Sequence, residues 1–142
     1  MYLFYFAILL TILSNIFYHL CQKSISNDIN PILSLMVTYI TAIIVCLIIL
    51  PLYNKEINFS HSIKELNWAN FTLGIAIVGL ELGFLLAYRA GWNISIAALV
   101  SNVAVAIFLI PIGICFFKEG LTIVNILGII FSIVGLILIR WK

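Results

Sequence analysis

The sequence predicts an all-α integral membrane protein with five transmembrane helices joined by short loops. Of its 142 residues, 65% are hydrophobic and only 8% are charged, and the mean hydropathy is +1.27. A soluble domain carries about 25% charged residues, so this chain cannot cover a water-facing surface. Its apolar residues fall into runs of roughly 20, the length that crosses a bilayer as a helix. Membrane strands are shorter and alternate in polarity, which excludes a barrel.

The five expected spans follow one another with little sequence between them. The first lacks the basic start and the small-residue cleavage site of a signal peptide, so we expect it to remain as a span. The second follows Asn30-Pro31, a typical helix start. The spans cover about residues 2–21, 32–53, 68–90, 93–117 and 121–141.

The connections are too short to form a second domain, so residues 1–142 are expected to be one transmembrane domain. Residues 54–67 form the longest connection. Within it, Ser62-Ile63-Lys64-Glu65 fits a capping box, and a brief interfacial helix is expected to lead to Trp68 at the headgroup level. Residues 91–93 and 118–120 are tight turns, so the last three spans should form consecutive antiparallel hairpins.

The distribution of basic residues gives almost no preferred orientation. With five spans, one side of the membrane holds three Lys or Arg residues and the other holds four. One interpretation is that the charge signal for topology is weak and that the cellular context fixes a single orientation. The other is dual topology, in which copies insert both ways and pair head to tail. The two sets are Lys55, Lys64 and Lys118, against Lys23, Arg89, Arg140 and Lys142.

Glu81 is the one charged residue in the interior of an expected span. A charge at membrane depth costs about 3 kcal/mol or more, so an acidic residue there is by default a functional hypothesis. Desolvation favours the neutral form of a carboxyl group. We therefore expect Glu81 to bind substrate or to exchange a proton for it; the alternative is that it only holds helices together.

Other polar residues are expected to surround Glu81. Asn15 and Asn102 fall at a similar membrane depth in the first and fourth spans, and convergent polar groups near the midplane are typical of transporter sites. Helical spacing predicts a polar stripe along the first span, which includes Tyr18, and places Tyr88 on the same helix face as Glu81. Interhelical hydrogen bonding alone is the alternative explanation for that stripe. The candidate substrate-binding or ion-coupling residues are Glu81, Asn15, Tyr18, His19, Tyr88, Asn102 and Trp92, the last of which also suits an interfacial belt.

Small residues predict close helix packing or a dimer contact in two spans. Gly79 and Gly83 form a G-x-x-x-G pair two residues from Glu81, so the carboxylate should point away from that face. Gly128, Ser132 and Gly135 form a similar stripe in the last span. Arg89 ends the third span, where it either snorkels to the interface or provides a counter-charge at the mouth of a cavity.

Several function classes have no support in the sequence. No catalytic constellation, phosphate loop or metal-spaced ligand set is present, so we expect neither an enzyme nor a cofactor. The net charge of +2 and the lack of a basic run argue against nucleic acid as a partner. Cys21, Cys46 and Cys115 lie in or at the ends of apolar stretches without paired spacing, so we expect neither a disulfide framework nor a metal site, and they should behave as small hydrophobes.

From Arg89 onward the chain resembles the C-terminal part of an EamA-type repeat of the drug/metabolite transporter superfamily. The resemblance lies in Phe116-Phe117-Lys118-Glu119-Gly120, followed by Asn125, Gly128 and Gly135, and in the end of the first span from Tyr18 to Ser24. It implies one half of an inverted-repeat transporter, because family members usually carry two such repeats and the smallest relatives work as antiparallel homodimers. Glu119 matches a family glutamate, for which we expect a structural role at the start of the last span.

The sequence therefore predicts a small multi-pass transporter in a prokaryotic plasma membrane. It would move a small metabolite or a cationic or zwitterionic compound by alternating access, coupled to protons and working as a dimer. Two alternatives remain at this stage. One is a flippase for lipids or lipid-linked substrates, and the other is an accessory half-subunit of a heteromeric transporter.

Overall fold

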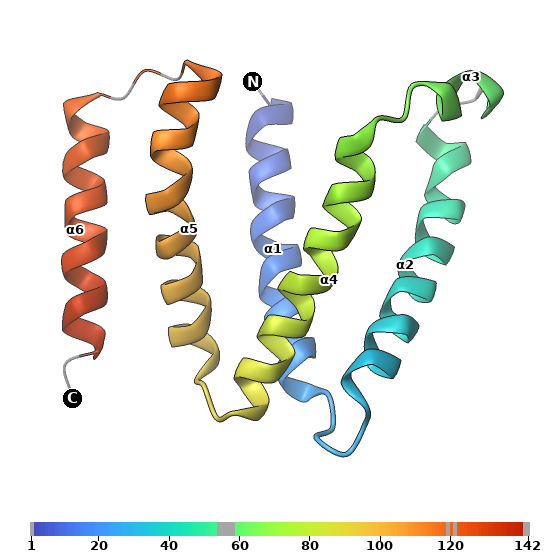
Figure 1. Cartoon of the computed structure of the whole chain (residues 1–142), viewed down its shortest axis with the longest axis horizontal. Helices are drawn as coiled ribbons and strands as arrows, with labels where there is room; N and C mark the ends of the chain where they lie inside the picture. Colours follow the sequence, from blue (N-terminus) through green and yellow to red (C-terminus); the bar gives the residue numbers. More distant parts are fainter. Residues whose placement is uncertain (1, 54–58, 119, 121, 141–142) are drawn as a thin grey trace. The chain divides into compact units, whose positions relative to one another are not determined.

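The computed structural model describes residues 2–53, 59–118, 120 and 122–140 (Figure 1). Within these residues the chain is helical and contains no strand, as expected from the composition. Ser62, the site of a predicted capping box, is among the described residues. The predicted role of Glu119 lies outside them. The helices are α1 (Tyr2–Ser24), α2 (Pro31–Tyr53), α3 (Phe59–Lys64), α4 (Trp68–Arg89), α5 (Ile94–Phe117) and α6 (Ile123–Arg140).

Four of the described helices, α1, α2, α4 and α5, are long and apolar enough to cross a membrane. Each has 22 to 24 residues, or about 33 to 36 Å at 1.5 Å per residue, which exceeds a hydrocarbon core of about 30 Å. The fifth predicted span falls on α6, a shorter apolar helix of 18 residues and about 27 Å, so its crossing of the membrane stays a prediction.

The chain divides into two compact units, Met1–Ala90 and Gly91–Lys142. In the first unit, α4 packs against both α1 and α2, whereas α1 and α2 do not pack against each other in the part that the structure describes. Figure 1 shows α4 running parallel to α1 and antiparallel to α2. The helix that carries Glu81 is therefore the central helix of this unit. In the second unit, α5 packs against α6.

Asparagine side chains begin two of the helices. Asn30 Oδ1 accepts hydrogen bonds from the backbone N–H groups of Ile32, at 2.9 Å, and Leu33, at 3.3 Å, so the predicted start of α2 is confirmed. Asn67 does the same for α4, because its Oδ1 accepts from Ala69 N at 2.9 Å while Asn70 Oδ1 accepts from Asn67 N at 3.2 Å.

The capping box predicted at Ser62 is wrong. Ser62 lies inside α3, so it cannot cap the start of a helix there. The reciprocal box lies five residues later, at Asn67 and Asn70, because an asparagine amide serves both roles that Ser and Glu have in the usual pattern. The interfacial helix itself is present as α3, which ends three residues before the N-cap of α4.

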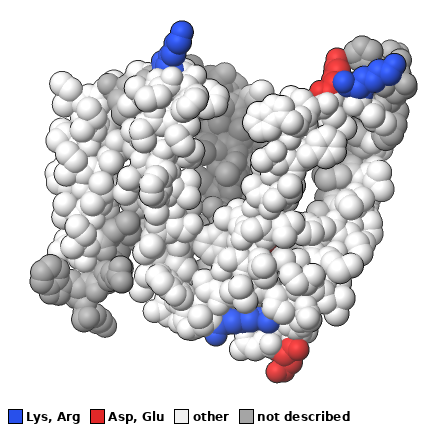
Figure 2. All heavy atoms as spheres, viewed as in Figure 1, with Lys and Arg blue, Asp and Glu red and all other residues white. Residues whose placement is uncertain are grey.

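The buried part of the first unit lies at one end of its helices. Of the residues that the structure describes in this unit, five are buried, and they come from the end of α1, the start of α2 and the end of α4: His19, Gln22, Leu35, Leu85 and Tyr88. Most other apolar side chains of the unit are exposed. On the face drawn in Figure 2, the charged side chains of this unit gather at the two ends of the helices, with an uncharged band between. This pattern is that of a lipid-facing surface.

The two asparagine caps at Asn67 and Asn93 give a matched stability test. Asn67 caps α4 through its side chain, whereas Asn93, the N-cap of α5, makes no such bond. We expect Asn67→Ala to lower the free energy of unfolding by about 1 kcal/mol and Asn93→Ala to change it little. Titration of SDS into mixed micelles, followed by circular dichroism, measures both. Equal effects of the two substitutions would contradict this account of the α4 start.

Candidate functional site

Glu81 lies on α4, half-buried between the neighbouring helices of the first unit. One of its carboxylate oxygens, Oε2, is buried and has no hydrogen-bond partner among the described residues. The charge of Glu81 interacts electrostatically with two tyrosine hydroxyl groups, those of Tyr18 on α1 and Tyr39 on α2. The carboxylate is therefore approached by a hydroxyl group from each of the helices that flank α4.

These tyrosines are themselves unsatisfied. The hydroxyl oxygens of Tyr18 and Tyr39 are buried without a hydrogen-bond partner, and so is Gln22 Oε1. Gln22 lies one helical turn after Tyr18 and interacts with it, but not at a geometry that satisfies either oxygen. We call Glu81, Tyr18, Tyr39 and Gln22 the Glu81 cluster.

A cluster of this kind is unfavourable unless something completes it. Each buried polar group without a partner costs about 1–3 kcal/mol, and a charged group costs more. Folded proteins leave few such groups, and those that persist call for a water, an ion or a ligand. Four unsatisfied oxygens contributed by three helices thus have the character of a binding site, with acceptor and donor capacity available for a polar guest.

A layer of rings closes the cluster on the side of the α1–α2 connection. The Tyr88 hydroxyl and His19 Nδ1 are hydrogen-bonded at 2.8 Å, and both residues are buried. Phe84 packs between them and Tyr18, with its ring centroid 4.7 Å from His19 and 5.9 Å from Tyr18. Because α1 contributes Tyr18 and His19 and α4 contributes Phe84 and Tyr88, this layer joins the two helices in the turns of α4 that follow Glu81.

The structure brings together four of the predicted site residues, Glu81, Tyr18, His19 and Tyr88. Asn15 is exposed on α1 and is not among them. Trp92 and Asn102 belong to the second unit, where both side chains are exposed. Their proposed part in the same site stays a prediction.

Sequence reasoning noted Gln22 only as part of the polar stripe along the first span, and it missed Tyr39 and Phe84. Both are aromatic residues within apolar runs, where aromatic side chains are ordinary. Tyr39 is the first tyrosine in the second span. Its hydroxyl group, which needs a polar partner when buried, was the feature that could have identified it from the sequence. Only the packing of α2 on α4 shows that this tip turns toward Glu81.

The glycines predicted to pack helices face open space within their own units. At Gly79 and Gly83 on α4, and at Gly128 and Gly135 on α6, no described atom lies within 4 Å of where a Cβ would stand. Ser132 bonds to Gly128 O within α6, at 2.9 Å. Helix packing or dimer contact through these residues therefore stays a prediction, and the space it requires is available.

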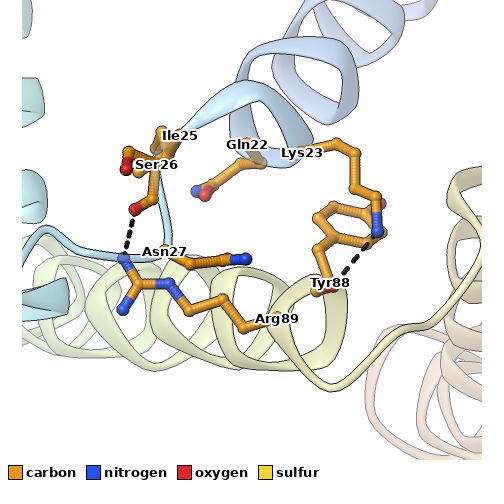
Figure 3. A pocket seen from close by; sticks show the side chains of 7 residues that line it. All are labelled: Gln22, Lys23, Ile25, Ser26, Asn27, Tyr88 and Arg89. Carbon is orange, nitrogen blue, oxygen red and sulfur yellow. Dashed lines mark hydrogen bonds between the residues drawn. The ribbon is translucent and has the colours of Figure 1, made fainter.

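A second polar region lies at the end of the first unit. A pocket of about 190 Å³ is formed by the end of α1, the connection after it and the end of α4 (Figure 3). Arg89, whose role the sequence left between two alternatives, lines it and holds the connection by donating from Nη2 to Ser26 O at 2.9 Å and to Ile29 O at 2.7 Å. The lining residues are Gln22, Lys23, Ile25, Ser26, Asn27, Tyr88 and Arg89.

Metal binding has no support in the part of the chain that the structure describes. No group of three or more His, Cys, Asp or Glu residues comes together there. The three cysteines are free and exposed on apolar helices. An exposed cysteine on a span faces lipid or another helix, because the helix surface around it is apolar.

The span-length apolar helices define the class of the protein, a multi-pass integral membrane protein. Residues 3–141 match the model of the EamA-like transporter family, and the chain belongs to this family. The predicted resemblance is thereby confirmed, and the family is one of membrane transporters of the drug/metabolite superfamily.

One curated relative shares nearly the whole length of the chain. It is an uncharacterized protein of Methanocaldococcus jannaschii, 31% identical over 141 residues that cover 94% of this chain and 95% of the relative. No solved structure matches the chain.

Two tyrosines of the site give opposite stability predictions. Tyr88→Phe leaves His19 Nδ1 buried without its partner, so we expect the free energy of unfolding to fall by about 1–3 kcal/mol. Tyr18→Phe removes a hydroxyl that has no partner, so we expect stability to stay constant or to rise slightly. Tyr5→Phe, at an exposed position on α1, is the control. SDS titration measures all three, and a larger loss for Tyr18→Phe than for Tyr88→Phe would contradict the hydrogen-bond assignment.

Proposed function

We propose that this protein moves a small metabolite or a cationic or zwitterionic compound across the membrane by alternating access, with Glu81 as the binding and coupling carboxylate. The observation that carries the proposal is the buried Glu81 Oε2, which has no hydrogen-bond partner among the described residues. A carboxylate kept in this condition within a span has a strong affinity for a cation or a proton.

The surroundings of Glu81 favour a positively charged group. The rings of Tyr18, Tyr39 and Phe84 lie in the same region, and aromatic faces attract cations by about 0.5–2 kcal/mol. The tyrosine hydroxyls add acceptor and donor capacity for a polar substrate. A compound with an amine or ammonium group would satisfy the carboxylate and the rings together.

Proton coupling follows from competition for a single carboxylate. In a medium of low dielectric, Glu81 is stable either beside a cation or with a proton bound, but not as an isolated charge. Substrate and proton would then displace one another at the same oxygen. Such exclusion couples the outward movement of one to the inward movement of the other.

An antiparallel homodimer would supply the missing half of the transporter. The chain has the size of one EamA repeat, and family members usually carry two repeats in inverted orientation. The Lys and Arg residues divide three to four between the two sides, so neither orientation is preferred. The open faces at Gly79 and Gly83 provide a surface for a second copy. The plasma membrane of a prokaryotic cell is the proposed location, in keeping with the archaeal relative.

The coupling role predicts the behaviour of Glu81→Gln. Glutamine keeps the shape of the side chain but cannot exchange a proton, so we expect substrate-driven proton flux to fall to the background of empty liposomes. Affinity for a cationic substrate should weaken about tenfold or more, the equivalent of one lost charge-assisted contact. A pH-sensitive dye inside liposomes reports the flux.

The matched control is Glu65→Gln, which removes a carboxylate from an exposed position outside the spans. It should transport as the wild-type protein does. Wild-type proton flux in the Glu81→Gln variant would sink the coupling role, and binding of long-chain lipids in place of small cations would favour a flippase.

The dimer proposal predicts that the C-terminus occupies both sides of the membrane. A C-terminal tag on the full chain, tested for accessibility in right-side-out and inverted vesicles, should be detected in both preparations in comparable amounts. A C-terminus confined to one side would rule out an antiparallel homodimer, and co-purification with a different chain would favour the heteromeric alternative.

A further inference from the structure

The pocket at the end of the first unit has a basic, hydrogen-bonding lining. Lys23 from α1 and Arg89 from α4 both line it, with the Lys23 side chain running along the Tyr88 ring and the Arg89 guanidinium turned toward Ser26 (Figure 3). Gln22, Ser26 and Asn27 add uncharged polar groups. Among the described residues, no acidic side chain lines it. Asp28 is not a lining residue, and its carboxylate lies 3.5 Å from the hydroxyl of Ser26, which does line the pocket.

Two buried atoms of the lining residues lack a partner. Arg89 Nε is a donor without a hydrogen bond, and Gln22 Oε1 is likewise unsatisfied. Gln22 is only 6% exposed, so water does not readily meet this need from outside. Because the two ends of a glutamine amide exchange by rotation, Gln22 can present a donor or an acceptor to a guest.

The lining is also held in place before any guest arrives. Arg89 is fixed by its bonds to the backbone oxygens of Ser26 and Ile29. Lys23 is fixed by a bond from Nζ to Tyr88 O at 3.1 Å and lies 5.7 Å from the centre of the Tyr88 ring. Side chains ordered in advance lose less conformational entropy on binding, so these contacts favour a site over two mobile surface charges.

We infer that this pocket binds a phosphate group. A tetrahedral oxyanion accepts from arginine, lysine and amide donors at once, and the two cations compensate its charge. The pocket volume of about 190 Å³ suits such a group with accompanying water, since each water occupies about 30 Å³ in the liquid. Lys23 and Arg89 lie at the ends of spans, at headgroup level, where basic pockets between helices bind lipid phosphates. The same chemistry would also take the phosphate of a soluble compound.

This inference does not depend on the transport cycle proposed above. The pocket uses a different set of side chains from the Glu81 carboxylate, with Gln22 as the residue common to both regions. Loss of phosphate binding would leave the Glu81 proposal standing, and loss of proton coupling would leave the phosphate site standing.

Binding of phosphate to the purified full-length protein tests the inference. The probes are inorganic phosphate and dihexanoylphosphatidic acid, with dihexanoylglycerol as the probe that lacks phosphate. A saturable rise in thermal stability measures each affinity. We expect Lys23→Gln to weaken phosphate binding about tenfold or more, as removal of a charged donor does. Lys64→Gln, which removes an equal charge from an exposed helix end, should bind as the wild-type protein does.

The probes also identify the source of the phosphate. Saturable binding of inorganic phosphate indicates a soluble ligand, and binding of phosphatidic acid alone indicates a lipid headgroup. Either result supports the site if Lys23→Gln weakens it selectively. Asn27→Ala, which changes the lining without touching the Arg89 bonds to the connection, should weaken it as well and guards against a misfolded first variant. No saturable binding, equal binding of dihexanoylglycerol, or equal affinity in Lys23→Gln and Lys64→Gln overturns the inference.

Discussion

The first unit depends on the packing of one helix, α4, between two helices that, within the described part of the chain, do not pack against each other. One side of α4 therefore packs on α1, another side packs on α2, and the rest of its surface is open. Glu81 points into the region where Tyr18 and Tyr39 approach from the two sides. The carboxylate on α4 thereby meets groups from two other helices, and because its Oε2 has no hydrogen-bond partner among the described residues it is the candidate site.

Polar groups along α1 and α4 form a continuous series from that carboxylate to the membrane surface. Tyr18 faces Glu81, His19 is bonded to Tyr88, and Gln22 belongs to both the Glu81 cluster and the pocket beside Arg89. A helix positions residues three and four apart on one face, so α1 can present all of its members of this series to α4. The buried end of the unit therefore contains polar side chains, His19, Gln22 and Tyr88, beside the apolar Leu35 and Leu85.

The exposed remainder has a different physical meaning. Apolar side chains that would be unfavourable in water are stable against lipid, and helix association there rests on close packing and interhelical hydrogen bonds. No described neighbour fills the space at Gly79 and Gly83, and their spacing from Glu81 predicts that they lie on the side of α4 away from the carboxylate.

The sequence by itself determined the class of the protein, because composition and run length leave only membrane helices as a way to satisfy the backbone. It also singled out Glu81, because the cost of a charge inside a span follows from the position of the residue in the sequence, whatever its neighbours are. The tertiary structure alone decided which groups face the carboxylate. Tyr39 lies 42 residues away in the chain and looks like any aromatic residue of an apolar span. Only the packing of α2 on α4 turns its hydroxyl toward Glu81, and only the α1–α4 contact gives Arg89 and Lys23 a common pocket.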